Sequence, residues 1–532
     1  MMDKPQARPQ NRTQALLLIL VVLYAMLAAG YFVLRYSGRW SDSDTANLTM
    51  TMVATRNEGT ILPSRGYALG FLYPALSTFI AATTGVSFSQ LQFLIYPLVA
   101  AGLSLIAFVL YRELLGDVTA GALAVLLLFI QPDFLFVIFR GSHEKVTWMM
   151  AMLAIFLLAR SFSAAGRLLH AAAYTVFFYL AILGMVASNA FFGSSVIVAV
   201  GVSLIGGWLI LFLSRREWAG DLARSSVLRL IYVTSAAMLV WFLDIFYLYL
   251  PARRILYELS TAAERAAAVS LGQEPRFDPY ATVGWGWVSN AAYLALILPS
   301  FILAGLSFLS WAWMGLRHLL RRQNILDYAP RFLLWLMYGG FGVQMLISLV
   351  TSQTGGVASN LQQRIFPAAM MLGVPLVAQS IMWLWRSQKR AILTRGMAAA
   401  LALFVLWGSG ASLLKATNDP WLSNYWSFWT PVEDAGVAWV EEHIQYQSVW
   451  LGLDGIRLGA HAIAEGFGDE SGNLSDVWGR DVRTRDAMIS NLDRELSIRR
   501  FIPLPDIEGQ NRVYDNGTSA HYHWRPLTPY QR

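Results

Sequence analysis

Residues 15–34 read ALLLILVVLYAMLAAGYFVL, twenty residues without a charge or a proline. An α-helix needs about 20 apolar residues to cross the hydrocarbon core of a membrane. A basic segment with Lys4, Arg8 and Arg12 precedes the run, as it does in a secretory signal peptide. The run is too long for the apolar region of a signal peptide, and it lacks a clear small-x-small cleavage site. We therefore predict an uncleaved first transmembrane helix.

Similar apolar runs recur along the chain, in which 56% of the 532 residues are hydrophobic and 14% are charged. Soluble domains carry about 25% charged residues. None of the runs alternates apolar and polar residues as a barrel strand would. Because backbone groups in lipid must be hydrogen-bonded within the segment, helices are expected, and the predicted fold class is an all-α polytopic membrane protein. One long uncharged stretch is divided at Ser188 and Asn189 because it is about twice a membrane crossing. The eleven predicted spans are 15–34, 91–111, 120–139, 146–160, 171–187, 194–213, 230–250, 290–315, 332–350, 365–385 and 397–414.

The net charge of +7 comes with basic residues that cluster in the loops between apolar runs. This pattern sets orientation in a membrane and does not indicate a nucleic-acid partner. With a cytoplasmic N-terminus, the basic loops 214–229, 316–331 and 386–395 all face the cytoplasm. The expected location is thus the plasma membrane, with several passes and an extracytoplasmic C-terminal segment. The absence of cysteine excludes disulfides, thiolate metal sites and cysteine catalysis.

Two domains are predicted, a membrane domain over 1–415 and a small soluble α+β domain over 416–532. Thr430-Pro431-Val432-Glu433 is a capping box that opens a helix to about His443. Residues 448–453 are predicted as a strand, residues 484–498 as a second helix, and Asn516-Gly517 as a hairpin turn. His521 and His523 alternate on a strand, where we expect them at the surface.

The first outer segment, 35–90, contains the acidic pair Asp42 and Asp44 directly after the first span. Two carboxylates at this spacing can bind one metal ion or act as a base and its orienting partner, and a solvated acidic turn has the same sequence. The segment 71–84 is apolar but too short to span, which predicts a helix lying on the membrane surface or an ordinary buried helix.

A second polar cluster, Arg140-Gly141-Ser142-His143-Glu144-Lys145, joins two predicted spans. His143 and Glu144 are candidates for binding a metal or an acceptor, and Arg140 and Lys145 for neutralising a phosphate. Snorkelling of long side chains at the membrane interface, with a helix cap, would explain the same residues.

Arg364 follows Gln362 and Gln363 at the outer start of the tenth predicted span. Basic residues are enriched on the cytoplasmic side of membrane proteins, so an arginine on the outer side is against this bias. The side chain would suit the phosphate of a membrane-embedded lipid, whereas an arginine at a helix end also serves as a surface anchor.

This arrangement resembles the GT-C superfamily of membrane glycosyltransferases. The shared pattern is a cytoplasmic N-terminus, one span, and a long outer loop with an acidic pair (Asp42 and Asp44) and a horizontal helix (71–84). His143-Glu144 matches the family's second polar motif by position, and Arg364 matches an arginine near the lipid phosphate by span count. The WWD-type triplet of oligosaccharyltransferases is absent, which favours transfer of a single sugar.

The resemblance implies an inverting transferase whose donor is a sugar on a polyprenyl phosphate and whose acceptor is a glycan, lipid or protein. Asp42 or Asp44 would deprotonate or orient the acceptor. Arg364, with Arg140 or Lys145, would stabilise the negative charge on the leaving phosphate. The resemblance leaves open whether a divalent metal such as Mg²⁺ or Mn²⁺ is bound or none is needed.

Two other functions fit the same sequence. One is a polytopic transporter or lipid flippase, although no internal repeat of the kind common in transporters is present. The other is a glycan polymerase or ligase, whose acceptor is itself lipid-linked. Replacing Asp42 and Asp44 by asparagine separates the first from an enzyme, since a transporter should keep its function.

Overall fold

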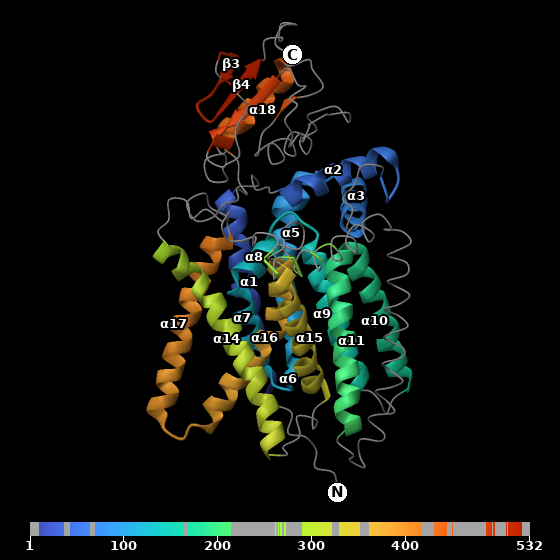
Figure 1. The fold of residues 1–532 in the computed structure, drawn as a ribbon, viewed down its shortest axis with the longest axis vertical. Helices are drawn as coiled ribbons and strands as arrows, with labels where there is room; N and C mark the ends of the chain where they lie inside the picture. The colour runs from blue at the N-terminus through green and yellow to red at the C-terminus, as the bar shows by residue number, and fades with distance from the viewer. Residues whose placement is uncertain are drawn as a thin grey trace.

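The predicted spans form the helices of a bundle in a computed structural model of the full chain (Figure 1). Each predicted span within the described residues coincides with one helix, except that 91–111 and 120–139 each comprise more than one helical segment. The division at Ser188 is confirmed, because α10 (Leu168–Ser188) ends there and α11 (Ala190–Leu213) begins two residues later. The predicted span 230–250 lies outside the described residues. The structure describes residues 10–36, 43–63, 70–163, 168–213, 261, 264, 267–268, 271–272, 290–321, 329–351, 361–416, 430–443, 449–450, 486–491, 493–494, 507 and 509–523.

The chain enters the bundle with α1 (Gln10–Tyr36) and passes through α4 (Phe88–Gln90), the π-helical turn η1 (Leu91–Ile95), α5 (Tyr96–Ala101) and α6 (Leu103–Leu115) as one long apolar segment. It continues through α9 (Glu144–Ser163), α10 and α11, and then through α14 (Asn290–Arg321), α15 (Ala329–Thr351), α16 (Leu361–Ser387) and α17 (Ala391–Ala416).

The predicted span 120–139 is a bent pair, which corrects the expectation of one straight helix. Its parts, α7 (Val118–Phe129) and α8 (Pro132–Phe139), meet at 78°. Pro132 lacks an N–H, and its ring disfavours helical backbone in the preceding Gln131, which is extended with φ −87° and ψ 115°. The bend therefore directs α8 across the bundle toward the loop that follows it.

Within the described residues, six helices are long and apolar enough to cross a membrane, and seven if the bent pair is one span. The eleven spans and their sidedness remain predictions. Segments that we expected on one face do meet at one end of the bundle, since Phe71 N–H donates to Ala187 O at 2.8 Å.

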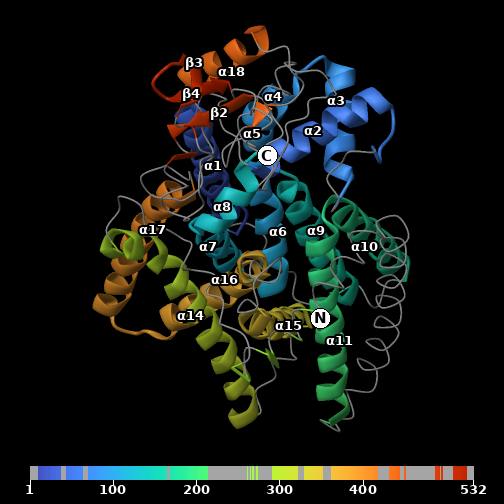
Figure 2. The same ribbon diagram turned by 45° about the horizontal axis from the view of Figure 1, so that its top comes forward.

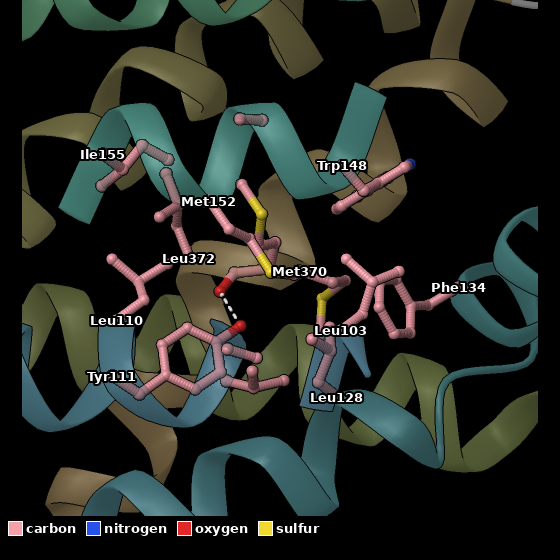
Figure 3. Packing of buried hydrophobic residues seen from close by; sticks show 14 of the residues in the cluster. Leu103, Leu110, Tyr111, Leu128, Phe134, Trp148, Met152, Ile155, Met370 and Leu372 are labelled. Atoms are coloured by element: carbon pink, nitrogen blue, oxygen red, sulfur yellow. Dashed lines mark hydrogen bonds between the residues drawn. The ribbon is translucent and has the colours of Figure 1, made fainter. Parts of the chain in front are cut away.

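The core lies where α6, α7, α9 and α16 pack together (Figure 3). Tyr111, Phe134 and Met152 are almost completely buried there. Trp148 meets Phe134 edge to face with ring centroids 5.3 Å apart, an arrangement that aromatic pairs favour. These contacts hold the helices that carry both ends of the α8–α9 loop.

Prolines inside two helices leave carbonyls that other helices satisfy. A proline at position i removes the hydrogen bond to the carbonyl of residue i−4. Pro375 in α16 thus frees Met371 O, which accepts from the Tyr111 hydroxyl at 2.7 Å. Pro299 in α14 frees Ala295 O, which accepts from Trp407 Nε1 at 3.1 Å.

Two helices before the second bundle segment lie at the end of the bundle nearer the C-terminal sheet (Figures 1 and 2). α2 (Ser43–Glu58) lies across that end, and α3 (Leu72–Thr84) runs more nearly along the bundle. The helix predicted over 71–84 is therefore present, and its position at a membrane surface remains a prediction. Its buried Tyr73 and Ser77, four residues apart, face the bundle.

The C-terminal part combines one helix with a small sheet, as the predicted α+β class requires. α18 (Pro431–His443) begins at the expected capping box, since Thr430 N–H donates to Glu433 Oε2 at 2.6 Å and Glu433 N–H to Thr430 Oγ1 at 3.2 Å. The strands are β1 (Val449–Trp450), β2 (Asp486–Ser490), β3 (Asn511–Asp515) and β4 (Ser519–His523), in the order β1-β2-β4-β3. β1 and β2 are parallel, and the other pairs are antiparallel.

Two further expectations for this part are wrong and a further one is confirmed. The helix expected over 484–498 is interrupted by β2, because residues 486–490 pair with strands on both sides, and Ala487 and Ile489 are fully buried. His521 is buried, not at the surface, because its ring packs against Trp439 of α18, with ring centroids 5.6 Å apart. The hairpin turn is confirmed, with Gly517 at φ 84°.

Candidate functional site

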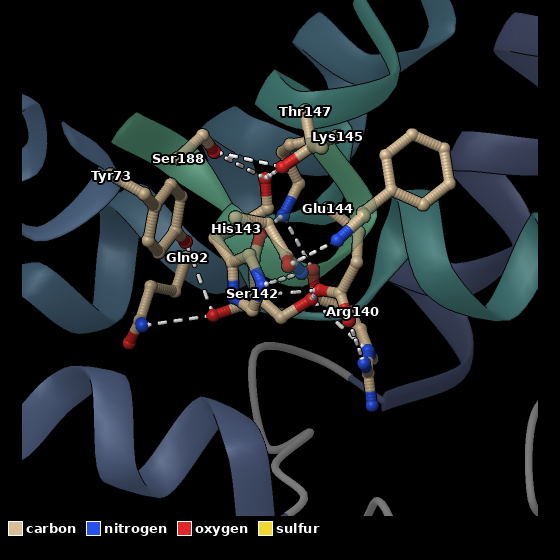
Figure 4. Close-up of polar contacts among 12 residues, drawn as sticks. Tyr73, Gln92, Arg140, Ser142, His143, Glu144, Lys145, Thr147 and Ser188 are labelled. Carbon is tan, nitrogen blue, oxygen red and sulfur yellow. Dashed lines mark hydrogen bonds and ion pairs between the residues drawn. The ribbon is translucent and has the colours of Figure 1, made fainter. Parts of the chain in front are cut away.

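The loop between α8 and α9 is polar and buried. Arg140, Ser142, His143 and Lys145 are each less than 10% exposed, whereas arginine and lysine are almost never buried unless they are paired. Interfacial snorkelling, the alternative we weighed, would leave the long side chains exposed. The loop is therefore a buried cluster of polar side chains (Figure 4).

Contacts within the loop fix its shape. Lys145 Nζ donates to Arg140 O and to Ser142 O, both at 2.6 Å. Arg140 Nε donates to Ser142 Oγ at 3.0 Å, and its guanidinium forms an ion pair with Glu144. The Glu144 carboxylate also accepts from the Ser142 hydroxyl. Arg140 and Lys145, which we predicted to neutralise a phosphate, thus make hydrogen bonds within the loop. The stretch Arg140–Lys145 keeps a formal charge of +1.

The charge state of Glu144 follows from these neighbours. Burial alone would raise the pKa of its carboxyl, but the Arg140 guanidinium, the His143 ring and the Ser142 hydroxyl outweigh that effect and lower the pKa well below its usual range. Glu144 is therefore ionised at neutral pH.

His143 is held by Asn189, the residue between α10 and α11, and by its neighbour Glu144. Its Nε2 lies 2.6 Å from Asn189 Nδ2. Asn189 Oδ1 accepts from Phe192 N–H at 3.0 Å, so the amide presents its NH₂ to the ring. His143 Nε2 then accepts, which places the ring proton on Nδ1, 3.8 Å from Glu144 Oε2.

This geometry does not fit a metal at His143 and Glu144. One metal-binding atom of the histidine faces an amide donor, and the carboxylate faces an arginine and a hydroxyl. Within the described residues, no group of three or more histidine and acidic side chains is arranged to hold a metal ion.

The carbonyl of Gly141 is the point where the outer segment meets the loop. It accepts from Tyr73 OH and from Gln92 Nε2, both at 3.1 Å. Gln92 Oε1 in turn accepts from the Thr49 hydroxyl of α2 at 2.9 Å. All three donor side chains are buried. A Cβ on Gly141 would lie only 2.6 Å from Thr45 Cγ2, so only glycine permits this approach.

The structure brings the backbone at the start of α2 beside the second polar cluster. Asp44 lies in the first turn of α2, next to Thr45, which contacts Gly141. Asp42 and the Asp44 side chain lie outside what the structure describes. Arg364 lies in the first turn of α16, and its side chain is also outside the described part. The structure therefore places the Asp44 backbone beside the loop and leaves Asp42 and Arg364 as predictions.

Sequence reasoning missed Tyr73, Gln92, Thr49 and Asn189. Gln92 carried a signal, because a lone amide within an apolar span must find a polar partner. Asn189 was seen only as the division between two spans. Tyr73 and Thr49 carried no signal, because their partners are distant in the sequence.

Comparison with known proteins places this geometry in a known fold. No family model and no curated protein matches the sequence. The chain matches the apo crystal structure of an oligosaccharyltransferase from Archaeoglobus fulgidus with a TM-score of 0.53 at 13% identity, over 84% of this chain and 64% of that one. It matches apo ArnT from Cupriavidus metallidurans with a TM-score of 0.52 at 12% identity, over 96% of this chain and 99% of that one. The chain has the GT-C fold of membrane glycosyltransferases.

The chain spans 64% of the length of the oligosaccharyltransferase and nearly all of ArnT. The ArnT match extends over 96% of the chain, well beyond the helical bundle. The all-α membrane architecture with a small α+β part, predicted from the sequence, is confirmed.

Proposed function

We propose that the chain is a glycosyltransferase that moves a sugar from a polyprenyl-phosphate donor to an acceptor at the end of the bundle where α2 meets the α8–α9 loop. The observation that carries the proposal is the contact between Thr45 and Gly141, which brings the turn that contains Asp44 against a buried polar loop of a GT-C fold. An acidic segment and a positively charged loop at one place suit the deprotonation of an acceptor beside a phosphate leaving group.

Similar structures support the donor class. One structure of the Archaeoglobus fulgidus protein is a complex with an inhibitory peptide and a dolichol-phosphate, and one of ArnT is bound to undecaprenyl phosphate. These ligands belong to those proteins. They make a polyprenyl phosphate the first donor class to test here.

In the proposed reaction, Asp42 or Asp44 takes the proton of the acceptor hydroxyl, and the acceptor oxygen attacks the anomeric carbon of the sugar. The bond from that carbon to the phosphate oxygen breaks, and polyprenyl phosphate leaves with the electron pair. Arg364 binds the phosphate, and the formal charge of +1 on Arg140–Lys145 adds to the attraction. Ion-paired Glu144 and hydrogen-bonded His143 shape the loop and do not transfer the proton.

The test is release of polyprenyl phosphate by the purified protein in nanodiscs. A panel of undecaprenyl- and dolichyl-phosphate sugars serves as donors, with a cell-envelope extract as acceptor. Acceptor-dependent release should be lost in the Asp42→Asn/Asp44→Asn variant. Glu58→Gln, at the far end of the same helix, is the matched control and should keep it.

Two other results would change the assignment. Release that survives the double substitution would remove Asp42 and Asp44 from the mechanism. Passage of a labelled polyprenyl-phosphate sugar between leaflets, with no release of phosphate, would replace the enzyme by a flippase.

A further inference from the structure

Gln92 uses both ends of its side chain to join two segments that are distant in the sequence. Its carbonyl oxygen accepts from Thr49 on α2 at 2.9 Å, and its amino group donates to Gly141 O in the loop at 3.1 Å. The side chain is fully buried. Because a backbone carbonyl only accepts, the amide has one possible orientation, and Gln92 is a directional bridge.

The bridge sits in an unusual backbone. Gln92 belongs to η1, a π-helical turn within an otherwise α-helical segment. Such turns are rare and occur frequently at functional sites. Here Leu91, Gln92 and Phe93 are all buried in succession, and the amide is presented between α2 and the loop.

The partner of Gln92 on α2 lies one turn beyond the residue that touches the loop. The Thr49 hydroxyl donates to Gln92 and also approaches Thr45 O at 2.8 Å, so its single proton is shared between two acceptors. Thr45 in turn contacts Gly141 and follows Asp44 directly. The bridge therefore acts on the turn that carries Asp44.

Resting on the proposed function, we infer that Gln92 is a positioning residue that holds the Asp44 turn of α2 in register with the Arg140–His143 loop. It touches no reacting atom in this role. Its loss should leave α2 and the loop folded but free to shift relative to each other. Because small misplacements of reacting groups strongly slow a reaction, turnover should fall more than donor binding.

Gln92→Met tests this role because methionine keeps the length and volume of the side chain and removes both hydrogen bonds. We expect amide hydrogen exchange in residues 43–58 to accelerate at least about tenfold. We expect kcat for polyprenyl-phosphate release to fall about 10- to 100-fold, with KM for the donor within about threefold.

Thr49→Val removes the same bridge from the other side. If the bridge is what matters, Thr49→Val and Gln92→Met each lower kcat, and the double variant is no slower than the slower single variant. Full additivity of the two losses would show that the residues act separately and would overturn the inference.

Ser77→Ala is the matched control. Ser77 is also fully buried, and its hydrogen bond goes to Tyr96 OH at 2.8 Å instead of to the loop or Thr49. It should lower thermal stability as Gln92→Met does and leave kcat and exchange in 43–58 unchanged. An equal fall of kcat in Ser77→Ala would show that Gln92→Met acts only by lowering the stability of the protein, and would overturn the inference.

Hydrogen exchange separates this inference from the proposed function. Unchanged exchange in Gln92→Met overturns the bridge whatever the turnover shows. Accelerated exchange in a protein whose wild type releases no polyprenyl phosphate would support the bridge and reject the proposed function.

Discussion

The Tyr111 hydroxyl donates to the carbonyl of Met371, the acceptor that Pro375 leaves without a partner in its own helix. The donor and acceptor belong to α6 and α16 and are both buried. A proline inside a membrane helix is tolerated where a neighbouring helix satisfies the freed carbonyl. Pro375 is therefore tolerated in α16 because the Tyr111 hydroxyl satisfies the carbonyl that the proline frees.

Tyr111→Phe should lower the free energy of unfolding by about 1–2 kcal/mol, because it leaves a buried carbonyl without a donor. In a Pro375→Ala background the same substitution should cost clearly less, since the alanine supplies the N–H that proline lacks. Thermal unfolding of the four proteins in detergent measures both costs. Equal costs in the two backgrounds would contradict the link between Tyr111 and Pro375.

Gly141→Ala should destabilise the protein by about 1–3 kcal/mol and abolish turnover, because its Cβ would lie 2.6 Å from Thr45 Cγ2. Thr45→Ser removes that methyl group and should restore part of both losses. Melting temperature and polyprenyl-phosphate release are the two measurements. No recovery in the double variant would mean that the steric contact with α2 is not the cause.

Glu144→Gln should destabilise the protein by about 3 kcal/mol at neutral pH, since it leaves the buried Arg140 without its counter-charge. The pKa of Glu144 is lower in the folded state than in the unfolded state, so its stabilising effect is fully present above the ordinary carboxyl value of 4.5 and is lost as the pH falls below it.

The difference in melting temperature between the wild type and Glu144→Gln should thus be constant from about pH 8 to 6 and shrink below about pH 4.5. Arg512, whose ion pair with Asp515 is exposed, provides the control: Asp515→Asn should cost less than about 1 kcal/mol. A Glu144 effect that shrinks as the pH rises would contradict the direction of the pKa shift.

Asn516→Ala should lower the free energy of unfolding of the C-terminal part by about 1–3 kcal/mol. The Asn516 amide donates to Val432 O of α18 at 2.7 Å, and its oxygen accepts from Ser519 N–H at 2.8 Å, so one side chain joins the helix to the hairpin. Faster proteolysis within 430–523 of the full chain would be the sign. Val513→Ala, at an exposed position on the same hairpin, should be nearly neutral.

Much of the bundle could be predicted because the length and charge of an apolar run are local properties. The capping box at Thr430 and the turn at Gly517 were likewise decided by neighbouring residues. The bend at Pro132 had a local cause too, and it was missed because the hydropathy of 120–139 is continuous across it.

The errors and omissions lie where distant partners decide. Residues 486–490 form a strand because β1 and β4 flank them, against their helical pattern. Gln92 and Tyr73 reach Gly141 across 49 and 68 positions. The predicted acidic and polar clusters remain candidates to test, and only the packing of α2 showed that the backbone of Asp44 lies beside the loop.

The helix prolines also bear on the order in which the chain is made. Synthesis proceeds from the N-terminus, so Tyr111 is already in the membrane when Met371 emerges 260 positions later. Ala295 is in the opposite situation, because its donor Trp407 follows it by 112 positions. Until α17 is made, the Ala295 carbonyl of α14 lacks the donor that it has in the folded bundle, so the hydrogen bonding of α14 is completed only after the chain has passed Trp407.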